Sequence, residues 1–153
     1  MTRWLDQDQQ KHWRAWISTS ILLSNRLSHE LSEANGLTLN DYEILVRLSE
    51  SDDRAMRMSE LANQTLLSRS RLSHQIDRME KAGLVERMVC DTDRRGQLAR
   101  MTDVGWDTLV KAAPDHVESV RRNFVDILTE DEFTALGLAL RKIADHLESL
   151  DGK

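Results

Sequence analysis

The sequence contains one cysteine, one proline and six glycines among its 153 residues, and each shortage excludes something. A single cysteine, Cys90, cannot form an internal disulfide bond, so the fold cannot depend on one. The sequence has no apolar run of about 18 residues that could cross a membrane and no export leader. Because helix interiors avoid proline and glycine, their scarcity favours a mostly helical protein. We therefore expect a soluble, cytoplasmic, mainly α-helical protein whose core needs no covalent staples.

The histidines argue against a metal site. They stand at positions 12, 29, 74, 116 and 146, without the short spacings typical of metal ligands, and no cysteine pair accompanies them. The sequence also contains no phosphate-binding loop and no nucleophile motif. We therefore expect no cofactor, no catalytic residue and no enzymatic activity.

Positive charge is concentrated in the middle of an acidic chain. The net charge is -5, yet residues 54–100 hold ten Arg and Lys against six Asp and Glu, which leaves -9 for the remaining residues. The acidic total argues against a protein that coats nucleic acid indiscriminately. A basic middle is expected if only this segment approaches phosphates. Uneven charge on an ordinary solvated surface is the alternative.

Apolar spacing predicts two amphipathic helices in the first third of the chain. Residues 4–33 place Trp13, Trp16 and further apolar residues three to four positions apart, and Gly36 ends the pattern. Thr38 can cap a second helix of about ten residues. The polar stretch "SDDRAM" that follows is predicted to be a connection.

Two short helices and a hairpin come next. A helix over about 59–64 and another from a Ser68 cap to about Lys81 have the spacing of a helix-turn-helix. From Leu84 the pattern alternates, which indicates a strand, and "DTDRRGQLARMT" (91–102) is predicted to form the hairpin tip and the return strand. A helix-turn-helix followed directly by a hairpin is a winged helix.

The C-terminal third is again helical. Thr102 can cap a helix that Pro114 either kinks or ends, and Thr129 with Glu132 can form a capping box for the last helix. The terminal helices have more apolar surface than a small winged helix needs, which predicts a homodimer of interleaved helices. The expected fold class is mainly α with a small β-hairpin wing.

The outer face of the second short helix carries the first group of candidate DNA contacts. With Leu72 pointing inward, the polar candidates on this helix are Ser68, Arg69, Ser70, Arg71, Ser73, His74 and Arg78. Arginine can grip guanine as a fork, serine and histidine can pair with several base edges, and a helix fits the major groove. Arg69, at the helix start, is placed for a phosphate. A solvated helix surface is the alternative.

The hairpin tip carries the second group. An arginine at a hairpin tip can enter the minor groove, and both Arg94 and Arg95 are placed for that. Asp91 and Asp93 would repel phosphate if unpaired, so we expect at least one of them to pair with a neighbouring arginine. A charged, soluble turn is the alternative.

The stretch "LSRSRLSHQIDRMEKAGLVERMVCDTDRRGQLARMTDVG" resembles the winged-helix core of the MarR family of bacterial transcriptional regulators. The resemblance extends over the whole chain in element order and is most specific over residues 58–105. It places the Asp-x-Arg of the family's wing on Asp93 and Arg95, which implies that Arg95 is the minor-groove finger and Asp93 its support. Gln97 departs from the pattern, because the family usually has an apolar strand residue there.

The resemblance also implies partners and a domain organisation. Similar proteins are homodimers that bind pseudo-palindromic operators on double-stranded DNA, and many release DNA when a small aromatic or phenolic effector binds. We expect a repressor with one domain over residues 1–153, containing a DNA-binding lobe at 37–105 and a helical dimerisation region at 1–36 and 106–153. Paired recognition helices would lie about 34 Å apart.

Two further features concern what the protein senses. His12, Trp13 and Trp16 lie near the expected effector pocket, although such aromatics also form cores and dimer interfaces. Cys90 precedes the wing, where a nearby arginine would favour its thiolate, and a redox-gated regulator is therefore an alternative to a structural thiol. A winged helix that binds an acidic protein instead of DNA is the other alternative.

Overall fold

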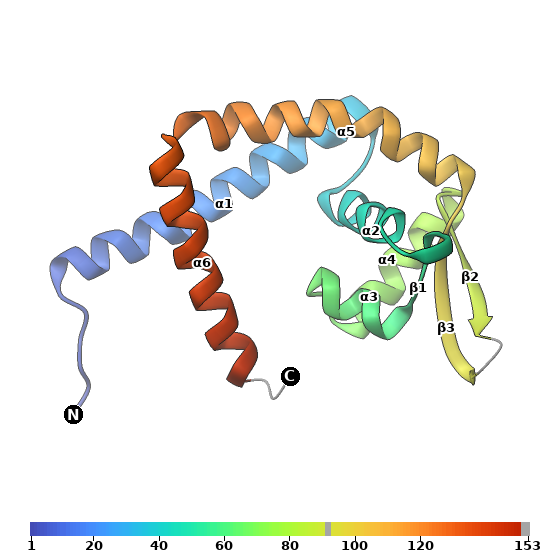
Figure 1. The fold of residues 1–153 in the computed structure, drawn as a ribbon, viewed down its shortest axis with the longest axis horizontal. Coiled ribbons are helices and arrows are strands. Elements are labelled where there is room, and N and C mark those ends of the chain that lie inside the picture. The colour runs from blue at the N-terminus through green and yellow to red at the C-terminus, as the bar shows by residue number, and fades with distance from the viewer. Residues whose placement is uncertain (91–92, 151–153) are drawn as a thin grey trace. The chain divides into compact units, whose positions relative to one another are not determined.

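The computed structural model describes residues 1–90 and 93–150, and the side chains of residues 90 and 93–95 lie outside that description. The elements are α1 (Gln7–Asn35), α2 (Leu39–Ser49), η1 (Asp52–Arg54), β1 (Ala55–Arg57), α3 (Met58–Thr65), α4 (Arg69–Lys81), β2 (Val85–Cys90), β3 (Asp93–Met101), α5 (Asp103–Asn123), η2 (Val125–Ile127) and α6 (Glu130–Leu150) (Figure 1). Among the described residues, no helix has the length and apolar character needed to cross a membrane.

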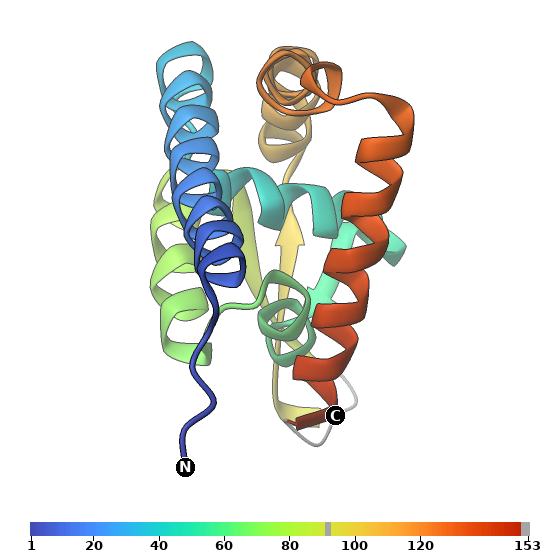
Figure 2. The same cartoon turned by 90° about the vertical axis from the view of Figure 1, so that its left-hand side faces the viewer.

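The chain divides into two compact units, Met1–His116 and Val117–Lys153. The expected organisation into a DNA-binding lobe at 37–105 and a helical dimerisation region at 1–36 and 106–153 stays a prediction. Figures 1 and 2 show α2, α3 and α4 gathered beside the strands within the first unit.

Local caps set the helix boundaries. Gly36 ends α1 in the left-handed conformation at φ 68°, where its N–H donates to a carbonyl one turn back. Thr38 and Asp41 form a reciprocal capping box at the start of α2. At α5 the Thr102 hydroxyl oxygen accepts from the Gly105 N–H at 3.0 Å. These caps confirm the predicted helix starts at Thr38 and Thr102.

The sheet has three antiparallel strands in the order β1-β3-β2. Val85 lies opposite Met101 in the expected hairpin, and Arg57 of β1 lies opposite Leu98 on the other edge of β3. The prediction that "SDDRAM" is only a connection was therefore wrong, since it contains η1 and most of β1. A strand of three residues is too short to show an alternating pattern.

The core of the first unit fixes which face of α4 points outward. Leu72, Ile76 and Met79, the predicted buried stripe of α4, are each at most 1% exposed. They belong to one cluster with apolar residues of α2, α3 and the sheet. Burying three such side chains contributes roughly 1.5–3 kcal/mol each, so this stripe fixes the rotation of α4 about its axis.

The first turn of α5 packs closely against the chain segment before β2. A Cβ atom at Gly105 would lie 2.1 Å from the Leu84 carbonyl oxygen and 2.8 Å from Met101 Cγ, so only glycine permits this approach. Beside it, the Arg54 guanidinium lies 4.1 Å from the Trp106 ring centroid. These contacts connect α5 to the lobe at its first turn.

His116 and Tyr42 meet where α5 packs against α2. Their ring centroids are 4.3 Å apart with an interplanar angle of 46°. Burial lowers the pKa of His116, and the nearby Glu43 carboxylate opposes that shift. Among the described residues, His116 Nδ1 is buried without a hydrogen-bond partner. This contact therefore favours the neutral imidazole.

Helix α5 continues through Pro114 to Asn123, so of the two predicted outcomes Pro114 does not end the helix. In the second unit, Thr129 and Glu132 form the predicted capping box of α6. Phe124 and Phe133 make an edge-to-face contact with centroids 5.7 Å apart. No residue of α6 among those described is fully buried, and most of its apolar side chains are exposed within a single chain, whereas Leu136 and Leu140 are half-buried.

Candidate nucleic-acid interface

Helix α4 presents the predicted recognition face to solvent. Ser68 caps it, with its hydroxyl oxygen accepting from the Arg71 N–H at 3.3 Å. The exposed candidates are Ser68, Arg69, Ser70, Arg71, His74 and Arg78, whereas Ser73 is half-buried. Since the opposite stripe is in the core, this face can enter a DNA groove without any change in the packing of α4.

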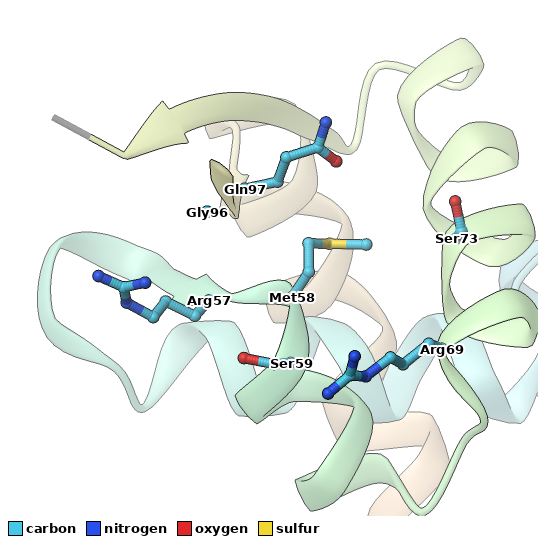
Figure 3. Close-up of a pocket in the computed structure, with 7 residues that line it drawn as sticks. All are labelled: Arg57, Met58, Ser59, Arg69, Ser73, Gly96 and Gln97. Carbon is cyan, nitrogen blue, oxygen red and sulfur yellow. The ribbon is translucent and has the colours of Figure 1, made fainter. Parts of the chain in front are cut away.

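A surface pocket of about 410 Å³ lies beside this face, and we call it the wing-base pocket. It is lined by Arg57, Met58, Ser59, Arg69, Ser73, Gly96 and Gln97. Figure 3 shows Arg69 extending from the start of α4 toward Ser59, while Arg57 points away from α4. The pocket thus joins three elements: the β1–α3 corner, α4 and β3.

The structure brings together two predicted contacts, Arg69 and Ser73, with residues that sequence reasoning missed. Arg57 belongs to the basic segment, but its place beside the wing depends on β1 pairing with β3. Gln97, the departure from the family pattern, is exposed at the pocket, where a polar side chain can contact an anion or a base. Cationic and hydroxyl groups at one opening can bind phosphate oxygens.

Arg78 is engaged with the start of α2. Its Nη2 lies 2.8 Å from Asp41 Oδ1 and 3.2 Å from Thr38 Oγ1. Gln75 also donates to Asp41 Oδ1, and the Asp41 side chain is only 8% exposed. This group of four residues, which we call the Asp41 brace, connects α4 to α2. The predicted role of Arg78 in DNA binding stays a prediction.

Arg87 of β2 is engaged with the other flank of α4. Its guanidinium donates to Asp77, Glu80 and Ser73. The hydrogen bond from Arg87 is the main reason that the pKa of Asp77 lies below its ordinary value. We call Arg87 together with Ser73, Asp77 and Glu80 the Arg87 brace. The predicted contact Ser73 therefore belongs both to the wing-base pocket and to a brace.

The remaining predicted residues are placed as follows. Arg94, Arg95 and Asp93 belong to β3, but their side chains lie outside the described part of the chain, as does the side chain of Cys90. His12, Trp13 and Trp16 lie on α1, and the two tryptophans are 56% and 45% exposed. The described residues contain no group of three acidic, histidine or cysteine side chains that could hold a metal ion.

Comparisons with known proteins show which proteins this chain is similar to. A model of the MarR family matches residues 37–96. The chain is similar to AbsC, a MarR family transcriptional regulator from Streptomyces coelicolor, with 51% identity, coverage of 97% of this chain and 99% of that chain, and a TM-score of 0.92. It is also similar to Sco3205 from the same organism, crystallised in complex with DNA, with 41% identity, 96% and 92% coverage, and a TM-score of 0.94.

A more distant relative, like AbsC and Sco3205, is a transcriptional regulator. The transcriptional regulator PecS from Dickeya dadantii is 28% identical over 132 residues, which cover 86% of this chain and 79% of PecS. The similarity to these three proteins spans most of each chain rather than the winged-helix core alone.

Proposed function

The chain belongs to the MarR family of transcriptional regulators, and from this premise we propose that it binds a pseudo-palindromic operator as a homodimer. The observation that carries the proposal is the exposed polar face of α4 beside the wing-base pocket. The DNA complex of Sco3205, at 41% identity, supports the same use of this fold. We further propose that the protein acts in the cytoplasm as a repressor.

The proposed contacts fall into two groups. Ser70, Arg71 and His74, exposed on α4, contact base edges in the major groove. Arg69 and Arg57, which line the wing-base pocket, contact phosphates and fix the register of the protein on the duplex. At the wing, Arg95 enters the minor groove with Asp93 as its support.

Exposed apolar side chains on α1 and α6 support the proposed homodimer. Trp16 on α1 is 45% exposed, and Ile143 and Leu147 on α6 are each 55% exposed in the single chain. A second copy that covers these residues removes them from water. We propose that a small aromatic or phenolic effector contacts Trp13, Trp16 and His12 and lowers the affinity for DNA.

Salt dependence tests the proposed function. The probe is a duplex recovered by the wild-type protein from a randomised library, and its binding is measured by fluorescence anisotropy at several salt concentrations. We expect log affinity to fall linearly with log salt concentration, because phosphate contacts release counterions. Arg57→Ala and Arg69→Ala should each reduce the slope by roughly one.

Lys111→Ala, which removes an exposed charge from α5, is the matched control and should leave the slope unchanged. Binding that is insensitive to salt, or failure to select any duplex, would contradict DNA recognition. A winged helix that binds an acidic protein would then be the better description.

A further inference from the structure

Arg87 lies on the wing strand β2, yet its polar contacts are with α4. Its side chain is 21% exposed. Nη1 lies 3.3 Å from Glu80 Oε2 and also donates to Asp77 Oδ1. Nη2 lies 3.0 Å from both the carbonyl oxygen and the hydroxyl oxygen of Ser73, and the Arg87 backbone N–H donates to Glu80 Oε1 at 2.8 Å. One arginine therefore contacts two turns of the recognition helix.

The first consequence concerns charge. Asp77 and Glu80 are acids on the helix that would approach DNA, and their side chains are 48% and 37% exposed. Unpaired carboxylates at this position would repel phosphates. Arg87 offsets part of this charge through its contacts with both carboxylates. Helix α4 can therefore have Asp77 and Glu80 beside the proposed interface with less repulsion of DNA phosphates.

The second consequence concerns the direction of the Ser73 hydroxyl. A serine hydroxyl has one proton to donate and two lone pairs to accept with. Arg87 Nη2 donates to the oxygen, so that oxygen is an acceptor in this contact and its own proton points elsewhere. Thr65 donates to the Leu61 carbonyl oxygen of its own helix at 2.7 Å, but Ser73 makes no such bond within the described chain.

Ser73 also lines the wing-base pocket with Arg69 and Gln97 (Figure 3). Its hydroxyl proton can therefore be offered to a group that enters this pocket. The group must be a hydrogen-bond acceptor, and DNA supplies two kinds of acceptor here: a phosphate oxygen and a purine N7 or O6 at a base edge.

We propose that Arg87 is a positioning residue of the DNA interface. It holds α4 against β2, offsets part of the charge of Asp77 and Glu80, and presents the Ser73 hydroxyl as a donor to an acceptor atom of the DNA. Arg87 itself contacts no DNA. This inference rests on the proposed function, since it requires α4 to bind DNA.

The test is a double-mutant cycle in the full-length protein. Arg87→Met, Ser73→Ala and the double variant are titrated with the duplex selected by the wild-type protein and with a scrambled duplex of equal composition. Arg87→Met and Ser73→Ala should each weaken binding to the selected duplex roughly tenfold, the size of one lost hydrogen bond in a charged setting. The double variant should bind no more weakly than Arg87→Met, because the contribution of Ser73 depends on Arg87.

Additive losses in the double variant would overturn the connection between Arg87 and Ser73. The kind of acceptor follows from the pattern of loss in Ser73→Ala. An equal loss on both duplexes assigns a phosphate oxygen, whereas a loss confined to the selected duplex assigns a base edge.

Two further variants separate positioning from stability and from charge. Arg87→Lys keeps the charge but cannot reach Asp77 and Ser73 together, so it should recover only the part of the lost affinity that depends on charge. If Arg87→Lys restores the full affinity for the selected duplex, positioning is wrong. Asp77→Asn added to Arg87→Met should recover part of the binding to the scrambled duplex, which a purely structural defect would not allow.

Arg47→Met is the matched control, because Arg47 forms an ion pair with Glu43 at 2.7 Å on α2 and lies outside the recognition helix. It should leave the preference unchanged. The thermal unfolding midpoint of every variant identifies those that are folded at the assay temperature. If the wild-type protein selects no duplex, the proposed function fails. If it does and folded Arg87→Met binds the selected duplex as tightly as the wild-type protein, this inference alone fails.

Discussion

Single substitutions can separate the two wing arginines, Arg94 and Arg95. The Asp-x-Arg spacing assigns the minor-groove contact to Arg95, so Arg95→Ala should weaken binding to the selected duplex roughly tenfold or more, the scale of a lost charge-assisted hydrogen bond. Arg94→Ala is the matched control and should have the smaller effect. Size-exclusion chromatography should show an unchanged oligomeric state for both. A larger loss for Arg94→Ala would reverse the assignment.

A second residue-scale prediction concerns pH and His116. Burial against Tyr42 lowers the pKa of His116 in the folded protein below the ordinary 6.5. The unfolded chain therefore binds this proton more readily, and the free energy of unfolding should fall as pH drops through about 6.5 toward the folded-state pKa. His116→Phe, which keeps an aromatic ring, should lose less stability than the wild-type protein between pH 8 and pH 5.5.

Chemical denaturation at several pH values measures this difference. His146→Phe removes a histidine from the exposed surface of α6 and serves as the control. If wild-type protein and His116→Phe lose the same stability over this range, then His116 does not carry the pH dependence.

Gly105 gives a third prediction, which depends on space alone. Gly105→Ala places a Cβ atom where the Leu84 carbonyl oxygen already lies, and both groups are backbone-bound and unable to rotate away. We expect a loss of about 1–3 kcal/mol in the free energy of unfolding, typical of overpacking. Gly137→Ala in α6 meets no atom within 4 Å and should instead stabilise by up to about 1 kcal/mol. Equal effects of the two changes would contradict the close approach.

At the scale of elements, the Asp41 brace predicts that α2 and α4 are energetically coupled. Arg78→Ala removes a donor from a carboxylate that is only 8% exposed, and the expected cost is about 1–3 kcal/mol in the free energy of unfolding. The cost of the Asp41→Ala and Arg78→Ala double variant should be less than the sum of the two single costs. Lys81→Ala, exposed on the same helix, is the control. Additive costs would mean that the ion pair contributes nothing.

The elements also show how far sequence reasoning extends. Helix ends at Gly36, Thr38 and Thr129 were predictable because each depends on hydrogen bonds within three or four residues. The strand β1 was not, since only its pairing with β3 makes it a strand. The same holds for Arg57, which that pairing places beside the wing.

Long-range partners explain the part of the candidate site that the sequence did not show. Arg87 meets Ser73 across 14 residues, and Arg78 meets Asp41 across 37. The polar face of α4 was visible as a helical pattern, but which of its side chains are held by neighbours depends on the packing of α2 and β2 against it. No spacing rule reports such contacts.

At the scale of the whole molecule, the exposed apolar residues predict a dimer. Ile143→Asp with Leu147→Asp should produce a monomer, because both side chains are 55% exposed in one chain and a second copy would bury them. The monomer should bind the selected duplex at least about a hundredfold more weakly, since two linked half-sites bind together. Analytical ultracentrifugation and anisotropy measure the two effects.

Lys142→Ala, which removes a charged side chain from the exposed surface of the same helix, is the control for the dimer prediction. A monomeric variant with wild-type affinity would contradict the proposed two-fold recognition, and a wild-type monomer would contradict the homodimer itself.

The two braces on α4 limit how this protein can be re-engineered. The helix has 13 residues, yet its orientation depends on Asp41 in α2 and on Arg87 in β2. A chimera that received α4 alone from another regulator would keep Asp41 and Arg87 facing side chains that did not evolve with them. The transplantable unit of DNA specificity therefore extends from Thr38 to Arg87, and libraries that vary only the helix would sample a part of it.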